Sequence, residues 1–128
     1  MANKNRLIKT FMDLVQIDSP TGEEDDMDQE VSNRLEALGF SVYHDSFKNV
    51  IANLPGIGDP IVLSAHLDTV EPGRGIKPIL EGDTLRSDGT TILGGDCKSG
   101  VTIVLEALET VIEAVSYTHL TLPTSDLV

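Results

Sequence analysis

The sequence has little positive charge, a single cysteine and no tryptophan. Nine lysines and arginines stand against 21 aspartates and glutamates, which gives a formal charge of −12. This balance argues against a nucleic-acid partner, because a nucleic-acid groove needs a basic patch to neutralise phosphates. One cysteine cannot form an internal disulfide, so a small secreted fold held by disulfides is excluded. With three phenylalanines and two tyrosines, aromatic side chains contribute little to a core.

Long apolar runs are also missing. No run approaches the roughly 20 residues that a helix needs to cross a bilayer. Behind the N-terminus, Lys9 and Asp13 interrupt the apolar residues, unlike the pattern of a signal peptide. We therefore expect a cytoplasmic protein with no membrane partner. The 128 residues, of which 40% are hydrophobic and 23% charged, allow one globular domain at most.

Two helices are expected near the N-terminus, where apolar residues recur at helical spacing. The first covers residues 7–15 and ends before Pro20, since a residue that precedes proline is pushed out of the α region. The second starts at Thr21, because Thr21 and Glu24 have the spacing of a capping box, and it closes at Gly39.

The pattern then shortens to the two-residue period of strands. Residues 61–65 read Ile-Val-Leu-Ser-Ala, a continuous run that is typical of a strand buried on both faces. Four shorter strands are expected at residues 41–45, 50–54, 79–80 and 84–86, the last two joined as a hairpin. A last helix is expected over residues 98–115.

The densest chemical signal follows the run at residues 61–65. His66 and Asp68 are two residues apart, so in extended backbone both side chains point the same way. Open α/β sheets place ligands at the carboxyl ends of their strands, and a carboxylate beside a metal-binding histidine can orient its ring. Taken alone, the pair fits a structural histidine at a strand end, hydrogen-bonded to the neighbouring aspartate, better than it fits a metal ligand.

A second signal opens the last helix, where two glycines precede Asp96. Taken alone, Asp96 is an ordinary helix cap. A phosphate-binding loop is excluded, because that motif needs glycines where Ile92 and Cys97 stand. Considered together, the imidazole of His66 and these carboxylates form the N/O donor set of a zinc-type site. Two such ions about 3.5–4 Å apart need a bridging carboxylate, for which Asp96 is the candidate.

These residues lie in a stretch that resembles the M20 family of zinc metallopeptidases, in particular its peptidase T-like, or tripeptidase-like, branch. The matching sequences are SAHLDTV at 64–70, EPGRGIKP at 71–78 and SDGTTILG at 87–94. PTGEE at 20–24 and residues 49–56 also fit. The resemblance covers roughly residues 5–115.

The resemblance implies an α/β fold. It identifies residues 1–115 as the N-terminal fragment of a catalytic domain, a partial, truncated three-layer α/β/α structure with a mixed sheet. Residues 116–128 do not match the family and lack a helical period, so we expect a disordered or artefactual tail. A terminal strand is the alternative for this segment.

The resemblance also implies roles for individual residues. His66 would bind one zinc ion, Asp96 would bridge two, and Asp68 would be the catalytic-site residue that orients His66. The peptide bond after Asp96 is cis in relatives. Where the branch reads Gly-Ala-Asp-Asp-Lys-Ala-Gly, residues 94–100 read Gly-Gly-Asp-Cys-Lys-Ser-Gly. Asp96 is kept, while Cys97 would perturb the site, add a soft ligand or fill a small buried space.

By the same resemblance, a full-length relative hydrolyses a peptide, such as a tripeptide, or an N-acyl amide bond. The metal pair would polarise the carbonyl and lower the pKa of a water, and a glutamate would accept its proton. Relatives are about three times longer and carry this glutamate, further metal ligands and a dimerisation domain beyond position 128. We therefore expect little or no turnover from this chain alone.

Two other functions remain open from the residues. A non-catalytic acidic metal-binding or interaction fragment would take up metal without hydrolysis. A cysteine hydrolase would pair Cys97 with His44, His66 or His119, although no local signature fixes that pairing. The acidic run at residues 23–28 is interpreted as a solvated helix start, since it lacks the ligand pattern of a calcium loop.

Overall fold

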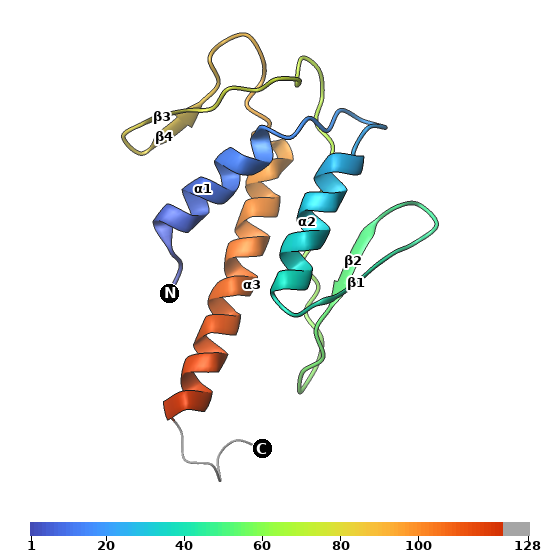
Figure 1. Ribbon diagram of the computed structural model, residues 1–128, viewed down its shortest axis with the longest axis vertical. Coiled ribbons are helices and arrows are strands. Elements are labelled where there is room, and N and C mark those ends of the chain that lie inside the picture. The colour runs from blue at the N-terminus through green and yellow to red at the C-terminus, as the bar shows by residue number, and fades with distance from the viewer. Residues whose placement is uncertain (122–128) are drawn as a thin grey trace.

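The computed structural model describes the backbone of residues 1–121 and the side chains of residues 1–115 (Figure 1). Three helices and four short strands form a mixed α/β structure, which confirms the expected class. In chain order the elements are α1 Lys4–Val15, α2 Asp25–Ala37, β1 Ser41–His44, β2 Val50–Asn53, β3 Ile79–Glu81, β4 Thr84–Arg86 and α3 Gly95–Thr121. Among residues 1–121, no helix is both long enough and apolar enough to cross a membrane.

Helix α1 forms where the apolar spacing predicts it. Asn3 caps its first turn, because the side-chain oxygen of Asn3 accepts a hydrogen bond from the backbone N–H of Arg6. Phe11, Leu14 and Val15 make its buried face. The helix ends at Val15, ahead of Pro20, as expected.

Helix α2 begins later than predicted, and the capping box at Thr21 is wrong. The helix starts at Asp25, and its cap residue, Glu24, makes no side-chain capping bond. The hydroxyl of Thr21 donates instead to the carboxylate of Asp68 at 2.7 Å. Because Asp68 lies 47 residues further along the chain, local spacing could not reveal this competing partner. The predicted end at Gly39 is confirmed by its positive φ of 97°.

The strands form two separate antiparallel pairs. Strand β1 pairs with β2, with Ser41 opposite Asn53, and β3 pairs with β4 in the predicted hairpin. The turn of that hairpin contains Gly82 at a φ of 60°. Parallel pairing within residues 1–121 is limited to one isolated bridge between Pro20 and Thr69. The mixed sheet of a three-layer domain is therefore represented here only in part.

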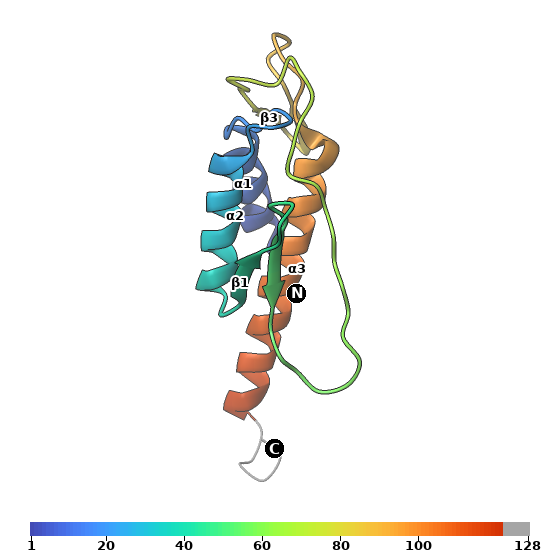
Figure 2. The same cartoon turned by 90° about the vertical axis from the view of Figure 1, so that its right-hand side faces the viewer.

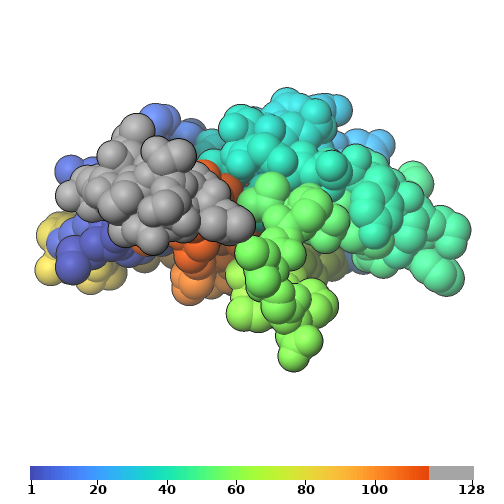
Figure 3. Space-filling view, turned by 90° about the horizontal axis from the view of Figure 1, so that it is seen from below, coloured from blue at the N-terminus to red at the C-terminus, as the bar shows by residue number. Residues whose placement is uncertain are grey.

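The buried strand predicted at residues 61–65 is wrong. This segment is extended but unpaired, and Ile61 and Val62 are 86% and 85% exposed. A strand buried on both faces needs neighbouring strands and a layer over each face, and the described residues provide neither at these positions. Figure 2 shows the segment running beside the helices with no strand next to it. Figure 3 shows the same part of the chain, in green, projecting from the body.

The main core lies where α2 and α3 meet the end of α1 (Figure 1). Its fully or nearly buried members are Leu14, Met27, Val31, Leu35, Val101 and Leu105. Phe11 and Val15 of α1 form a smaller cluster with Ile76. The helical pattern of the sequence ends at Val115, but α3 continues to Thr121. The rest of the predicted tail, residues 122–128, lies outside the described residues.

Candidate metal centre

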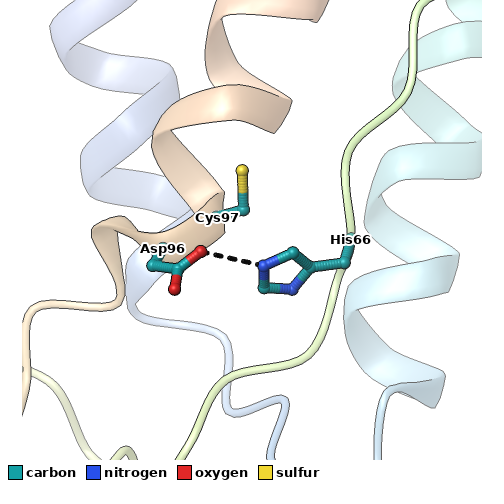
Figure 4. Close-up of side chains that lie close together, drawn as sticks. All are labelled: His66, Asp96 and Cys97. Carbon is teal, nitrogen blue, oxygen red and sulfur yellow. Dashed lines mark hydrogen bonds and ion pairs between the residues drawn. The ribbon is translucent and has the colours of Figure 1, made fainter.

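The structure brings His66 and Asp96 together although they are 30 residues apart in sequence. His66 belongs to the extended segment and Asp96 to the start of α3, and His66 Nε2 lies 2.9 Å from Asp96 Oδ1. Figure 4 shows the two side chains pointing toward each other. The site is open to solvent, since the side chains of His66 and Asp96 are 50% and 96% exposed.

Asp68 lies on the other side of the imidazole, as the two-residue spacing predicts. Its Oδ1 is 3.0 Å from His66 Nδ1, and its Oδ2 accepts the hydrogen bond from Thr21. Hydrogen bonds to Asp96 and then to Asp68 raise the pKa of His66 above its ordinary value. The bonds from Thr21 and His66 lower the pKa of Asp68. In its protonated form, the imidazole can donate from both ring nitrogens to the flanking carboxylates.

The backbone around His66 is held by the loop that precedes α2. Ala65 and Leu67 pack against the main core, so His66 between them points to the opposite side. The hydroxyl of Ser19 donates to the carbonyl of Leu67, and the N–H of Thr69 donates to the carbonyl of Ser19, both at 2.8 Å. These two bonds fix the segment on each side of Asp68.

The backbone at the start of α3 is irregular around Asp96. Asp96 and Cys97 have non-helical backbone angles, and the peptide bond between them is cis, as the resemblance implies. Regular helix follows from Lys98, the position predicted for its start. Lys98 is fully buried, and its ammonium group donates to the carbonyl of Ile17. Burial lowers the pKa of Lys98 to about 8, although the charge of Asp18 opposes the shift.

The donor set suits a divalent transition metal. Zinc–ligand bonds of about 2.0–2.2 Å at tetrahedral angles place neighbouring N and O ligand atoms about 3.3 Å apart. The 2.9 Å between His66 Nε2 and Asp96 Oδ1 is close to that spacing. Asp96 Oδ2 makes no hydrogen bond within the described part of the chain and remains available to a second ion. Asp68 already holds the remaining ring nitrogen, as orienting carboxylates do in metal sites.

Two contacts near the site are not predicted by the sequence. The resemblance includes Thr21 near the site, but the role predicted for Thr21 is helix capping, and its bond to Asp68 is new. The buried bond from Lys98 to Ile17 is also new. A threonine near a helix start and a lysine after a cysteine carry no local signal for these contacts, because their partners are distant in sequence. The roles predicted for His66, Asp68 and Asp96 agree with their placement and stay predictions.

Several known proteins with similar sequence or structure are named as hydrolases. No protein-family model matches the chain. A putative [LysW]-lysine/[LysW]-ornithine hydrolase of Pyrococcus abyssi is 37% identical over 82% of this chain and 29% of its own length. The uncharacterized protein YqjE of Bacillus subtilis is 38% identical over 85% of this chain and 32% of its own length.

Two solved structures share the fold closely. The aminopeptidase PepT of Bacillus cereus superposes with a TM-score of 0.81 at 36% identity, over 88% of this chain and 33% of that one. A tripeptidase of Staphylococcus aureus superposes with a TM-score of 0.78 at 36% identity, over 89% of this chain and 34% of that one. The chain spans about a third of the length of each of these relatives.

The fold and these relatives relate the chain to hydrolases of the peptidase type. Within that class, the chain is related to the peptidase T-like, or tripeptidase-like, branch of the M20 family, which confirms the resemblance drawn from the motifs. The covered share of each relative agrees with the expected N-terminal part of such a catalytic domain.

Proposed function

We propose that this chain carries one half of a two-metal hydrolase site that acts on a peptide, such as a tripeptide, or on an N-acyl amide bond. The observation that supports the proposal most directly is the approach of His66 Nε2 to Asp96 Oδ1 at 2.9 Å. Two donors of different type from separate segments meet at one open point, where a substrate can reach them.

Each residue has a distinct part in this proposal. His66 binds one ion through Nε2, while Asp68 holds Nδ1 and thereby fixes the ring. Thr21 in turn holds Asp68 through its second carboxylate oxygen. Asp96 offers one oxygen to each of two ions. When bound, zinc or a similar ion supplies the Lewis acidity that polarises the scissile carbonyl.

The complete reaction needs groups that these 128 residues do not include. The resemblance assigns the general-base glutamate and further ligands to a later part of the domain, so we expect metal uptake but little or no hydrolysis from this chain. The cytoplasmic location, the small-peptide substrate and dimerisation of a longer relative belong to the same proposal.

A non-catalytic metal-binding role is the second candidate. The high exposure of Asp96 favours it, because an open carboxylate binds ions weakly and leaves catalytic water unshielded. Both candidate functions predict that the chain binds metal, and only the hydrolase function predicts hydrolysis by a longer protein that contains it.

Calorimetric titration with Zn²⁺ tests the shared element. We expect saturable binding by the 128-residue chain, weakened about tenfold or more in His66→Ala and Asp96→Ala, since even outer ligand partners contribute 10–100-fold. His44→Ala and Asp59→Ala are matched controls: His44 is bonded to Asp28 on α2, and Asp59 lies in an exposed loop. Equal affinity in all five proteins would overturn the site. Tripeptide hydrolysis that Asp96→Ala abolishes would overturn the expected inactivity.

A further inference from the structure

A third donor lies beside the pair. Cys97 is the only cysteine of the sequence, and its Sγ, His66 Nε2 or Nδ1 and a carboxylate oxygen of Asp96 lie within 4.8 Å of one another. We propose that the Cys97 thiolate is a third protein ligand of this metal site and makes the site select thiophilic ions. The inference rests on the metal site proposed above and extends it to a residue at which the chain departs from its family pattern.

The placement of the three donors supports ligation. They come from two segments, and Figure 4 shows Cys97 beside the facing side chains of His66 and Asp96. A tetrahedral ion with a zinc–sulfur bond of about 2.3 Å needs Sγ roughly 3.5 Å from the N and O ligands. The present spread of up to 4.8 Å therefore closes by rotation of the exposed Asp96 and half-buried Cys97 side chains, without movement of the helix.

The glycine at position 100 leaves room for the thiol. The sulfur of Cys97 lies over Gly100, where an added Cβ would collide with it, and that same position is 3.6 Å from Ala65 Cβ. Any larger residue at position 100 would meet the sulfur, so the glycine provides the space that the side chain occupies. Cys97 itself is only partly buried, which leaves it open to ions from solvent.

The negative groups around Cys97 favour a bound cation. Asp96 is adjacent to Cys97, and Asp68 lies on the other side of His66, so a thiolate here adds a third negative group. Like charges this close repel one another, and a divalent cation removes the repulsion. On coordination the thiol proton leaves to solvent and a metal–sulfur bond forms.

Soft sulfur changes which ions the site prefers. Imidazole and carboxylate accept a broad range of divalent ions, whereas thiolate favours Zn²⁺, Co²⁺ and Cd²⁺ over Mn²⁺ and Mg²⁺. A site with Cys97 as ligand therefore discriminates against the hard ions that a His/Asp pair alone would accept.

Cobalt titration of the whole 128-residue chain under reducing conditions tests the inference. We expect a thiolate-to-cobalt charge-transfer band in the near ultraviolet, and no other thiol of the chain can produce it. Cys97→Ser should lose that band and keep the weaker visible bands of His66 and Asp96 ligation. In Cys97→Ser, Zn²⁺ affinity should fall roughly tenfold or more, because loss of a direct ligand exceeds loss of an outer partner. Mn²⁺ affinity should stay unchanged.

Alkylation of the thiol provides a second measurement that needs no variant. Zn²⁺ should slow modification of Cys97 in the parent chain, and Mg²⁺ should not. Cobalt binding that depends on His66 but shows no charge-transfer band, with full Zn²⁺ affinity in Cys97→Ser, would overturn this inference and leave the metal site intact. If the chain binds none of these ions, both the metal site and the role of Cys97 as its ligand are overturned. A band that vanishes on dilution would place the sulfur in a contact between copies and also overturn it.

Discussion

Two apolar stretches of similar composition have opposite surroundings in this molecule. In α3, Val101 and Leu105 are buried in the main core, whereas Ile61 and Val62 of the extended segment are almost fully exposed. The helices find partners within the described chain, since α1, α2 and α3 cover one another. The extended segment contacts that core only toward its end, at Ala65 and Leu67. An apolar composition allows a stretch to be buried, but the stretch is buried only where other elements of the chain pack against it.

Amide hydrogen exchange should show the largest difference between the two regions. The backbone of residues 54–65 makes no hydrogen bond within the described part of the chain, so its amides should exchange almost as fast as in an unfolded peptide. Amides in the middle of α1 and α3 should exchange at least about a thousandfold more slowly, given the several kcal/mol of a typical folded domain. Comparable protection in both regions would show that the segment is paired in solution.

Truncation of one side chain in each region should sharpen the contrast. Leu14→Ala removes a fully buried side chain and should lower the free energy of unfolding by about 3 kcal/mol, within the 2–5 kcal/mol typical of such cavities. The matched change Val62→Ala should alter it by less than about 0.5 kcal/mol. Urea unfolding measures both. A large effect of Val62→Ala would contradict the exposure of the segment.

The ion pair that joins α1 to α3 should have a smaller, pH-dependent effect. Both oxygens of the nearly buried Glu106 carboxylate accept hydrogen bonds from Arg6, at 2.7 and 2.8 Å. Glu106→Gln should cost about 2 kcal/mol at pH 7, the size of a hydrogen-bonded buried charge. Glu81→Gln, which breaks an exposed pair with Arg86, should cost less than about 0.5 kcal/mol.

The sign of the pH dependence follows from the same contact. Hydrogen bonds from Arg6 lower the pKa of Glu106 from 4.5 to about 2, so the folded state holds the charged carboxylate more tightly. The contribution of Glu106 to the free energy of unfolding is complete above pH 4.5 and is lost as pH falls from there toward 2. Over this range, the free energy of unfolding of the parent chain should therefore fall more steeply with decreasing pH than that of Glu106→Gln. Parallel curves would contradict the assigned coupling.

The smallest effect is expected where the two regions touch at the site. Thr21→Val removes the hydrogen bond that holds Asp68 and should weaken Zn²⁺ binding by less than about tenfold, because Thr21 contacts the orienting Asp68 and no metal ligand. Thr21→Ser keeps a hydroxyl and should restore affinity. The free energy of unfolding should change by about 1 kcal/mol or less, because the contact is exposed. Calorimetry separates affinity from stability.

The sequence predicted elements whose cause is local. Helix α1, the end of α2 at Gly39, the β3–β4 hairpin and the regular part of α3 follow from spacing and turn chemistry. The predicted start of α2 was wrong because Thr21 bonds to the distant Asp68 instead of capping the helix. The buried strand predicted at residues 61–65 was wrong because burial depends on neighbouring strands and covering layers, which no local sequence pattern describes.

The site divides in the same way. The residue types and the two-residue spacing of His66 and Asp68 were visible in the sequence, and their side chains do face the same way. The approach of Asp96 was predicted from the combined donor types and supported by the family resemblance, since no spacing rule connects residues 30 positions apart. Thr21 entered the site by a contact that only the folded chain shows.

The unpaired segment also governs how copies of this chain should meet. Extended apolar backbone with free N–H and C=O groups is a template for intermolecular β-sheet, and Ile61 to Leu63 offer such an edge. Asp59 and Pro60 directly precede it and oppose strand addition, and the net charge of −12 keeps the chains apart. Salt screens that repulsion, so aggregation should rise with ionic strength and begin at this edge.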